Sequence, residues 1–452
     1  MCMRVCADDS MPPYSHHRKS VITNSTLRKS GAQETTMSMK RRDFLQATAA
    51  AGVMGLPGVR MAHAQEGPVR IGLMLPMSGI GAEAGAAWLA GAKVGVAQWN
   101  EKGGVLKRQI ELVVRDDKFT SAGAVAAARE LAGSGVNLLI GGSQSPMALA
   151  TAPILPELKA LMVAPCPTVM SLTHENFQRN FFRLSWNAYI AFAGIGNMLT
   201  DRFKEVETWS CIVPDSENGR DMARFFTIGV QRAASKAGRQ VKVLDPVFAS
   251  LNKADYKVEI NSLMNAPSQG LFVGLTAAPC ISLLQQGRAV GMDRKFKVIG
   301  DAGTELMIAK AMQKSTPANL WSISYWVPGT EAGKRNPMST PLYDGYVKLT
   351  GDRNPPSIVQ SSHRCVLALA NAIAKAGSTE TDAVIAALEG LDFDTAVGKY
   401  HIRKEDHQGL GQAYIAKVGV RDADPGYGIV DAISYNEADV AEPPAPGKPI
   451  SL

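Results

Sequence analysis

Small polar side chains follow several of the apolar segments of this sequence. Ser143 and Ser145 come after the apolar segment 136–140, and Thr168 comes after 161–164. Hydroxyls at the first turn of a helix lie beside free N–H groups, where they hold an anion or simply cap the helix. The sequence therefore predicts that these three hydroxyls bind the carboxylate of a small ligand, with helix capping as the alternative.

A glycine turn offers a second kind of chemistry. Gly79-Ile80-Gly81-Ala82-Glu83-Ala84 has the GxGxxA spacing of a dinucleotide-binding turn. Pro76-Met77-Ser78 separates it from the preceding apolar segment, so the turn is looser than the one that a pyrophosphate requires. We interpret it as a strand-to-helix loop whose N–H groups hold an anion, with Ser78 as a further ligand-binding candidate. No cofactor is predicted.

Common catalytic and metal-binding patterns do not occur in the sequence. GxSxG, HExxH and GxxxxGK[ST] are all missing. The cysteines after residue 64 form no CxxC or CxxH pair, which disfavours a metal site; they are Cys166, Cys211, Cys280 and Cys365. We expect a protein that is not an enzyme and that has four free thiols. One disulfide is the alternative that an oxidising compartment allows.

Short apolar segments alternate with alanine-rich helical segments, which is typical of parallel βαβ units. Strands are predicted near 69–75, 110–115, 136–140, 161–164, 208–213, 241–248, 270–274, 297–300, 320–326, 397–402 and 412–418. Helices are predicted near 82–99, 122–132 with Thr120 or Ser121 as its cap, 188–203, 218–236, 338–350, 359–376 and 380–389. The alternation restarts near 208, so two α/β blocks follow one another. A Pro-rich tail, 436–452, is predicted to be unordered.

The first 64 residues have the pattern of an export signal. The pair Arg41-Arg42 precedes a mild Ala/Gly-rich stretch that ends in Ala62-His63-Ala64, which predicts a twin-arginine signal peptide at 39–64 with cleavage after Ala64. Residues 1–38 are interpreted as an untranslated or disordered extension. These 64 residues hold nine Lys/Arg and four Asp/Glu, so cleavage reduces the formal charge of +7 to about +2. We expect a periplasmic globular protein of two domains that binds no nucleic acid.

Four segments resemble the leucine/isoleucine/valine-binding type of periplasmic receptor. They are 69–79, 100–117, 139–143 and 391–398, and they recur in the order of that family over residues 68 to about 420. The most specific phrase runs from Gly103 to Leu112 and is followed by paired aspartates.

The resemblance implies an α/β fold of two doubly wound, Rossmann-like lobes joined by three hinge crossovers. Lobe 1 would comprise 68–187 and 327–407, and lobe 2 would comprise 188–326 and 408–435. It also implies the solute-binding subunit of an ABC importer, a monomer that closes over a small carboxylate-bearing solute and then docks on an inner-membrane permease. The solute would be an amino acid or an aromatic or organic acid. The twin-arginine translocase would be a partner during export.

The ligand is expected beyond the carboxyl ends of the strands, where Cys166, Asn218, Thr276 and Asp301 are further candidates. In receptors of this type, aromatic residues pack against the ligand and acidic residues bind its ammonium group. The matching positions carry other residue types here: Ala84, Asn218 and Thr276 or Ala277 for the aromatics, and Ala302 and Ala188 for the acids. Because a buried ammonium without a carboxylate is costly, either Asp301 or Glu83 replaces the missing acid or the ligand lacks that charge.

Two more candidates come from a late helix and from the crossovers. His363 falls where the family often has a tyrosine facing the cleft. There it would bond a carboxylate or carbonyl and make binding vary with pH near neutrality; a capped or surface histidine is the alternative. Trp186 and the pair Tyr325-Trp326 would stack on the ligand, with hinge packing as the alternative.

Two other functions stay open from sequence alone. A ligand sensor that reports to a membrane regulator can have the same fold, because one fold serves several functions. An exported NAD(P)-dependent oxidoreductase is supported only by the glycine turn and by the twin-arginine signal, which often serves cofactor proteins.

Overall fold

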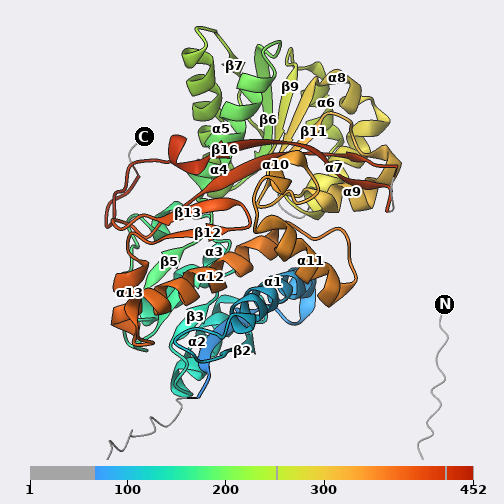
Figure 1. The fold of residues 1–452 in the computed structure, drawn as a ribbon. Coiled ribbons are helices and arrows are strands. Elements are labelled where there is room, and N and C mark those ends of the chain that lie inside the picture. The colour runs from blue at the N-terminus through green and yellow to red at the C-terminus, as the bar shows by residue number, and fades with distance from the viewer. Residues whose placement is uncertain (1–66, 251–252, 423–424, 451–452) are drawn as a thin grey trace, which may run out of the picture. The chain divides into compact units, whose positions relative to one another are not determined.

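Residues 67–250, 253–422 and 425–450 are described by the computed structural model, in which three sheets carry the α/β alternation (Figure 1). The first sheet is parallel throughout, in the order β2-β1-β3-β4-β5. Its strands are β1 (Val69–Leu75), β2 (Ile110–Asp116), β3 (Leu138–Ile140), β4 (Leu161–Ala164) and β5 (Phe181–Arg183). Because the strand order reverses between β1 and β3, a ligand crevice is expected at their carboxyl ends.

The second sheet has eight strands and is mixed. Its order is β16-β15-β11-β10-β9-β6-β7, and β8 also pairs with β6. The parallel strands are β6 (Thr208–Pro214), β7 (Lys242–Val243), β8 (Val247–Ala249), β9 (Gly270–Val273), β10 (Val298–Asp301) and β11 (Leu320–Ser324). The antiparallel strands are β15 (Gln412–Val420) and β16 (Tyr427–Asn436). A small antiparallel sheet contains β12 (Asp392–Thr395), β13 (Gly398–Ile402) and β14 (Gly409–Leu410).

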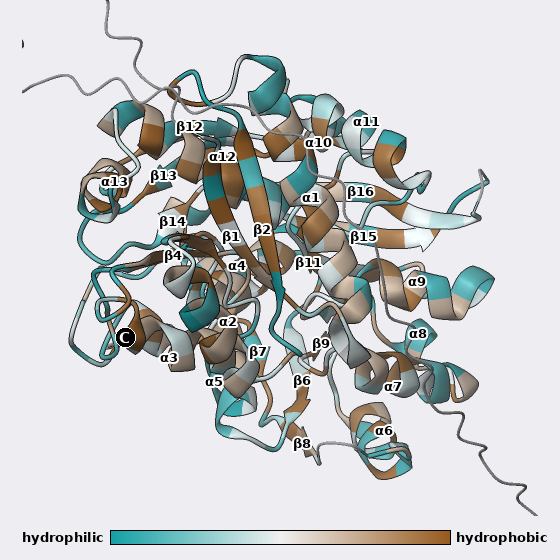
Figure 2. Ribbon diagram, turned by 90° about the horizontal axis from the view of Figure 1, so that it is seen from below, coloured by the Kyte–Doolittle hydropathy of each residue, from teal (hydrophilic) through white to brown (hydrophobic). Residues whose placement is uncertain are grey.

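Helices cover both faces of the two large sheets (Figure 2). Clusters of buried apolar side chains lie between the layers. On the first sheet they are α1 (Ala82–Glu101), α2 (Ser121–Gly133), α3 (Ser145–Thr151), α12 (Ile358–Ala376) and α13 (Thr381–Leu388). On the second sheet they are α4 (Ala188–Arg202), α5 (Glu217–Lys236), α6 (Lys257–Asn265), α7 (Ala278–Ala289), α8 (Met292–Lys295) and α9 (Leu306–Met312). The remaining helices are α10 (Glu331–Lys334) and α11 (Ser339–Thr350). We call the part built on β1 to β5 the first lobe and the part built on the eight-stranded sheet the second lobe.

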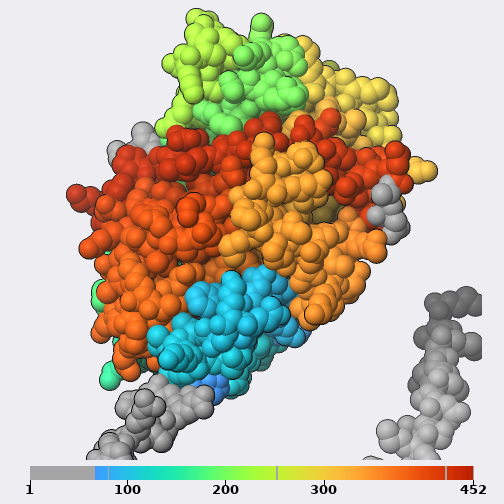
Figure 3. All heavy atoms as spheres, viewed as in Figure 1, coloured from blue at the N-terminus to red at the C-terminus, as the bar shows by residue number. Residues whose placement is uncertain are grey.

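Close packing of α1 on α12 brings the start of α12 to the carboxyl edge of the first sheet. Gly91 allows this approach, because a Cβ at that position would lie 2.0 Å from the carbonyl oxygen of Val359. Trp88 Nε1 also donates to Ser361 Oγ at 3.1 Å. Figure 3 shows the C-terminal segments in orange lying directly against the N-terminal segments in blue.

Most predicted elements are present, and the exceptions have physical reasons. Thr120, not Ser121, caps α2 by accepting the N–H of Gly123 at 3.0 Å. The prediction of a single strand at 241–248 is wrong. Residues 244–246 separate the short strands β7 and β8, because Pro246 has no N–H to continue the ladder of hydrogen bonds. Strands β5, β12, β14 and β16 and helices α6 to α10 were not predicted from the sequence.

The tail is not unordered over the residues that follow β16. Glu437 and Glu442 are both buried. Glu437 Oε2 accepts the N–H of Gly411 at 2.7 Å, and Glu442 Oε1 accepts from Asn187 Nδ2 at 2.5 Å. These bonds fix the tail against the start of α4 and the chain that enters β15.

The fold is α/β with two doubly wound lobes, as the sequence predicted. The chain passes between the two large sheets after β5, after β11 and after β14. The signal peptide, its cleavage site and the extension before it lie outside the described residues. Within the described part of the chain, no helix has the length and apolarity that crossing a membrane requires.

Candidate functional site

A cavity of about 700 Å³ lies where the carboxyl ends of strands from both lobes meet. Thr168 and Trp186 reach it from the loops after β4 and β5. Glu305 reaches it from the loop after β10, and Tyr325 follows β11 directly. Ser357, just before α12, completes the wall of the first lobe. Ligands of parallel α/β sheets bind at this edge, so the cavity is the candidate binding site.

Thr168 lines the cavity, and Ser145 holds the loop that carries it. Ser145 Oγ accepts the N–H groups of Thr168 and Val169, each at 3.1 Å. The carbonyl of Thr168 accepts the N–H of Ala188 at the start of α4, at 2.8 Å. The Ser145 hydroxyl is therefore used inside the protein, and of the two it is Thr168 that belongs to the cavity wall.

An aromatic pair forms another wall of the cavity. The rings of Trp186 and Tyr325 are stacked, with centroids 3.7 Å apart and planes 7° from parallel. Both line the cavity. Cys166 does not line it; its Sγ lies 3.5 Å from Ser361 Oγ on α12. The pair provides a flat apolar surface of the kind on which a planar ligand stacks.

Asp301 is a structural acid at the end of β10. Its Oδ2 accepts the N–H groups of residues 303, 304 and 305 at 3.1, 2.7 and 3.3 Å, and the hydroxyl of Ser322 at 2.5 Å. Its Oδ1 accepts from Cys280 Sγ at 3.3 Å. Asp301 is fully buried and does not line the cavity. Its carboxylate folds the loop that follows it and has little capacity left for a ligand.

Glu305 is the buried acid of the cavity. Its φ is 45°, a conformation that costs a residue other than glycine about 1–3 kcal/mol and is found where the surroundings enforce it. Its Oε1 accepts the hydroxyl of Ser357 from the first lobe at 2.9 Å. Burial raises the pKa of Glu305 to about 8, and the hydroxyls of Ser324 and Ser357 oppose this rise.

A second contact between the lobes lies at the cavity rim. Lys310 Nζ on α9 lies 3.3 Å from Glu83 Oε1 on α1. Both side chains are exposed, so this ion pair contributes about 1 kcal/mol or less. Asp352 and Arg353 add one charge of each sign from the loop before α12.

Four sequence candidates with short polar side chains lie away from the cavity. Ser78 is exposed and donates to Asp116 Oδ2 at 2.8 Å. Ser143 is fully buried, with its Oγ 3.7 Å from Met147 Sδ. Asn218 and Thr276 are exposed, and neither lines the cavity.

His363 also lies away from the cavity, contrary to the cleft position that the sequence suggested. It is buried between α12 and α1, where its Nε2 lies 2.8 Å from Gln98 Oε1. Burial lowers the pKa of His363 to about 3, so the ring is neutral throughout the physiological range. It packs the first lobe and has no role as a switch near neutrality.

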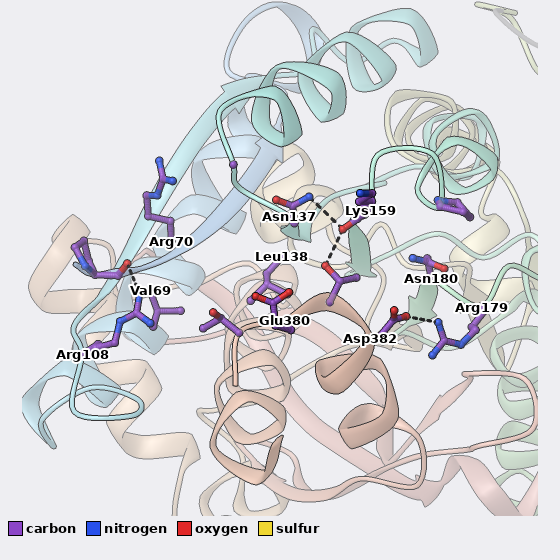
Figure 4. A pocket seen from close by; sticks show the side chains of 15 residues that line it. Val69, Arg70, Arg108, Asn137, Leu138, Lys159, Arg179, Asn180, Glu380 and Asp382 are labelled. Carbon is purple, nitrogen blue, oxygen red and sulfur yellow. Dashed lines mark hydrogen bonds and ion pairs between the residues drawn. The ribbon is translucent and has the colours of Figure 1, made fainter. Parts of the chain in front are cut away.

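A second cavity, of about 830 Å³, lies at the opposite edge of the first sheet (Figure 4). It is lined where strands begin, with Arg70 on β1 and Lys159 just before β4. Arg179 Nη1 pairs there with Asp382 Oδ1 at 2.6 Å. This edge is far from the strand ends at which α/β sheets bind ligands, so we do not assign the solute site to it.

Glu305 and Ser357 are among the cavity residues that the sequence analysis did not name. Glu305 lies three residues after Ala302, which stands where the family has an acid. Ser357 precedes a helix whose start was predicted at 359. The one available signal for Glu305 was its place in the loop after a buried strand, where Asp301 was named as one candidate acid.

The fold and the cavity define a two-lobe α/β solute-binding protein. The chain belongs to the periplasmic binding protein family, whose model matches residues 68–424. It is similar to the leucine-, isoleucine-, valine-, threonine- and alanine-binding protein of Pseudomonas aeruginosa, with 25% identity over 331 residues, 73% of this chain and 84% of that protein. A Leu/Ile/Val-binding protein homolog 4 of Brucella abortus is 25% identical over 394 residues, 82% of this chain and 88% of that protein.

Solved structures show the same fold. One is a leucine-, isoleucine-, valine-, threonine- and alanine-binding protein from Brucella ovis in a closed conformation, with a TM-score of 0.75, 18% identity, and coverage of 85% of this chain and 100% of that one. Another is a solute-binding protein of an ABC transporter from Rhodopseudomonas palustris in complex with 3,4-dihydroxybenzoic acid, with a TM-score of 0.68, 20% identity, and coverage of 82% and 98%. The type I periplasmic binding protein fold is therefore established.

Proposed function

We propose that this protein is the solute-binding receptor of an ABC importer and that it binds a small carboxylate-bearing solute between its lobes. The solute is an amino acid or an aromatic or organic acid. The cavity of about 700 Å³, walled by strand-end residues of both lobes, is the observation that carries this proposal. Its volume lies within the range of roughly 300–1,000 Å³ that is usual for small-molecule sites.

The cavity wall supplies contacts for both parts of such a solute. The Thr168 hydroxyl is a donor for a carboxylate, and the Trp186–Tyr325 pair is a surface for an apolar or aromatic body. Because a bound solute contacts both lobes, it binds the closed arrangement more tightly than the open one. Reversing a 99:1 preference for the open form requires about 5.5 kcal/mol of such differential affinity. The closed form then docks on the permease.

The proposed place of action is the periplasm. The pattern of 39–64 supports export by the twin-arginine translocase, and the permease would be the partner after export. N-terminal sequencing of exported material tests the export route: the mature chain is expected to begin at Gln65. A periplasmic protein that retains residues 1–38 would contradict it.

Solute binding is tested with the full exported chain and a panel that contains amino acids, benzoate and 3,4-dihydroxybenzoate. A member of the panel is expected to raise the melting temperature and to reduce the radius of gyration in small-angle scattering. Thr168→Val is expected to weaken that binding about 10- to 100-fold, since a hydrogen bond to a charged group contributes about 1.5–3 kcal/mol. Glu111→Gln, on the exposed face of β2, is the matched control. Scattering that stays the same with every solute, or a solute that is chemically altered, would contradict the proposal.

A further inference from the structure

Glu305 supports an inference about the class of solute, and it rests on the proposed function. We propose that Glu305 is the specificity-determining residue of the cavity: it meets the solute as a neutral carboxylic acid and selects anionic solutes that have no free ammonium group. The O–H of the neutral acid donates a hydrogen bond to the anionic group of the solute, and the proton stays on Glu305. Wherever Glu305 is ionised before binding, the complex takes up one proton from solvent.

The surroundings of Glu305 favour its neutral form. The side chain is 7% exposed although it lines the cavity. Its Oε1 accepts the Ser357 hydroxyl, which favours the ionised form, but burial outweighs this bond, and no described cation lies within ion-pair distance of the carboxyl group. Its backbone is held in place because its N–H is bonded to Asp301 and to Ser322, at 3.3 and 3.1 Å. A carboxyl group in such a place stays protonated to a higher pH than in water, in line with the pKa of about 8.

The other charges around the cavity balance one another. The titratable groups that line it are Glu83 from α1, Lys310 from α9, Asp352 and Arg353 from the loop before α12, Tyr325 after β11 and Tyr427 from β16. Asp301, behind Glu305, accepts N–H groups of its own loop and the hydroxyl of Ser322 on β11, and its charge adds to the rise that burial causes in the pKa of Glu305. Two acids and two bases remain on the wall when Glu305 is neutral, so the wall itself has no excess of negative charge to attract an ammonium group.

A buried guanidinium whose charge acts on Tyr325 adds positive potential. Arg364 on α12 is 2% exposed, and its Nε and Nη2 have no hydrogen-bond partner among the described residues. Burial raises the pKa of Tyr325 well above its ordinary value, and the charge of Arg364 opposes that rise, so the guanidinium acts on the cavity wall. The guanidinium lies over the Tyr400 ring, 4.4 Å from its centre, and the charge of Glu437 also acts on it. A buried cation with unpaired donors is stabilised by an anion nearby.

The two solute classes differ in the sign of their pH dependence. An ammonium group would need the ionised form of Glu305, so its affinity would fall about tenfold for each pH unit below the pKa. An anion needs the neutral form, so its affinity falls about tenfold for each unit above the pKa. The first class releases a proton on binding and the second takes one up.

Isothermal titration calorimetry of the full chain measures this proton exchange, from heats in two buffers of different ionisation enthalpy at each pH. Benzoate and L-leucine are the probes. Benzoate is expected to bind more tightly than L-leucine and to take up almost no proton at pH 6 and about half a proton at pH 8. In Glu305→Gln, which keeps both an acceptor and a donor, the uptake should vanish and the affinity for benzoate should stay constant between these pH values. Glu111→Gln should behave as the unmodified chain does.

Opposite results overturn the selection of anions. These are tighter binding of L-leucine with proton release, or proton uptake that persists in Glu305→Gln. The proton count of the unmodified chain decides the question even if the variant does not fold. If no solute of the panel closes the lobes in scattering, the proposed function fails and the anion selectivity fails with it. Closure by an amino acid with proton release overturns the anion selectivity alone and leaves the receptor function standing.

Discussion

Replacing Glu305 by glutamine should remove a pH dependence of stability that the fold imposes. Burial raises the pKa of Glu305 from 4.5 to about 8, so the folded protein binds this proton more tightly than the unfolded chain does. Between those two pH values the free energy of unfolding falls as the pH rises, by about 1.4 kcal/mol for each pH unit. Below the lower value both states are protonated and the effect is absent. Above the upper value it has reached its full size, about 5 kcal/mol as an order of magnitude.

Urea unfolding at several pH values between 5 and 8 measures this effect. The quantity of interest is the free energy of unfolding of Glu305→Gln minus that of the unmodified chain, because every other titrating group cancels in this difference. The difference should grow in favour of the variant as the pH rises, since glutamine keeps the contact with Ser357 and cannot ionise. Glu111→Gln provides the baseline. A difference that is constant between pH 5 and pH 8 would refute the assignment of a neutral buried acid.

Three further predictions concern packing and buried charge in the first lobe. Arg183→Met should lower the free energy of unfolding in urea by about 3–5 kcal/mol. The fully buried guanidinium bonds a carbonyl, a hydroxyl and an amide, and its charge also compensates the buried acids Glu442 and Asp406. A loss below about 1 kcal/mol would contradict this role. Gly91→Ala should lower the free energy of unfolding by about 1–3 kcal/mol or more, because its Cβ would meet the carbonyl of Val359. Gly133→Ala, with open space around it, should change the free energy of unfolding by no more than about 1 kcal/mol. Equal effects of the two variants would show that α1 and α12 do not approach as described. The nuclear magnetic resonance signals of the His363 ring should not titrate between pH 5 and pH 8, because burial lowers its pKa to about 3; a midpoint near neutrality would contradict its burial.

The regular elements were predictable because their signals are local. An apolar run such as Val69–Leu75 and a capped helix such as Ser121–Gly133 carry their periodicity and their boundaries in adjacent residues. Strands β12 and β16 were missed because their support is not local. In β12 polar and buried residues alternate over only four positions, and β16 is held by its pairing with β15 along nine residues.

The tail shows the same limit for irregular structure. Proline-rich composition favours disorder, but Glu437 and Glu442 are buried through bonds to residues far away in the sequence. No pattern within the tail reports such partners. Composition therefore predicted disorder and missed the side chains that anchor the tail.

The sequence candidates that line the cavity are those next to strand ends. Thr168 and Trp186 line the cavity because they follow β4 and β5 closely, and the rule for parallel sheets locates such positions. Asn218 and Thr276 satisfy the same rule and still do not line the cavity. Their loops follow β6 and β9, whereas the wall of the cavity in that lobe comes from the segments that follow β10 and β11 and from the start of β16. The rule gives the edge of a sheet, and the contact between lobes decides which strands at that edge take part.

The acid of the cavity illustrates why side-chain roles need the folded loop. The sequence analysis looked for an acid at the position of Ala302 and left three options open: Asp301, Glu83, or a ligand without the ammonium charge. In the structure the carboxylate of Asp301 turns the following residues around itself, and positive φ values at Gly303 and Glu305 complete the turn. This geometry makes Asp301 a support and makes Glu305 the acid that faces Ser357 across the cleft. Asp301→Asn should therefore affect solute binding through the position of Glu305: the affinity should fall in the chain that carries Glu305 and change little when Glu305→Gln is already present. Equal losses in both backgrounds would show that Asp301 touches the solute itself.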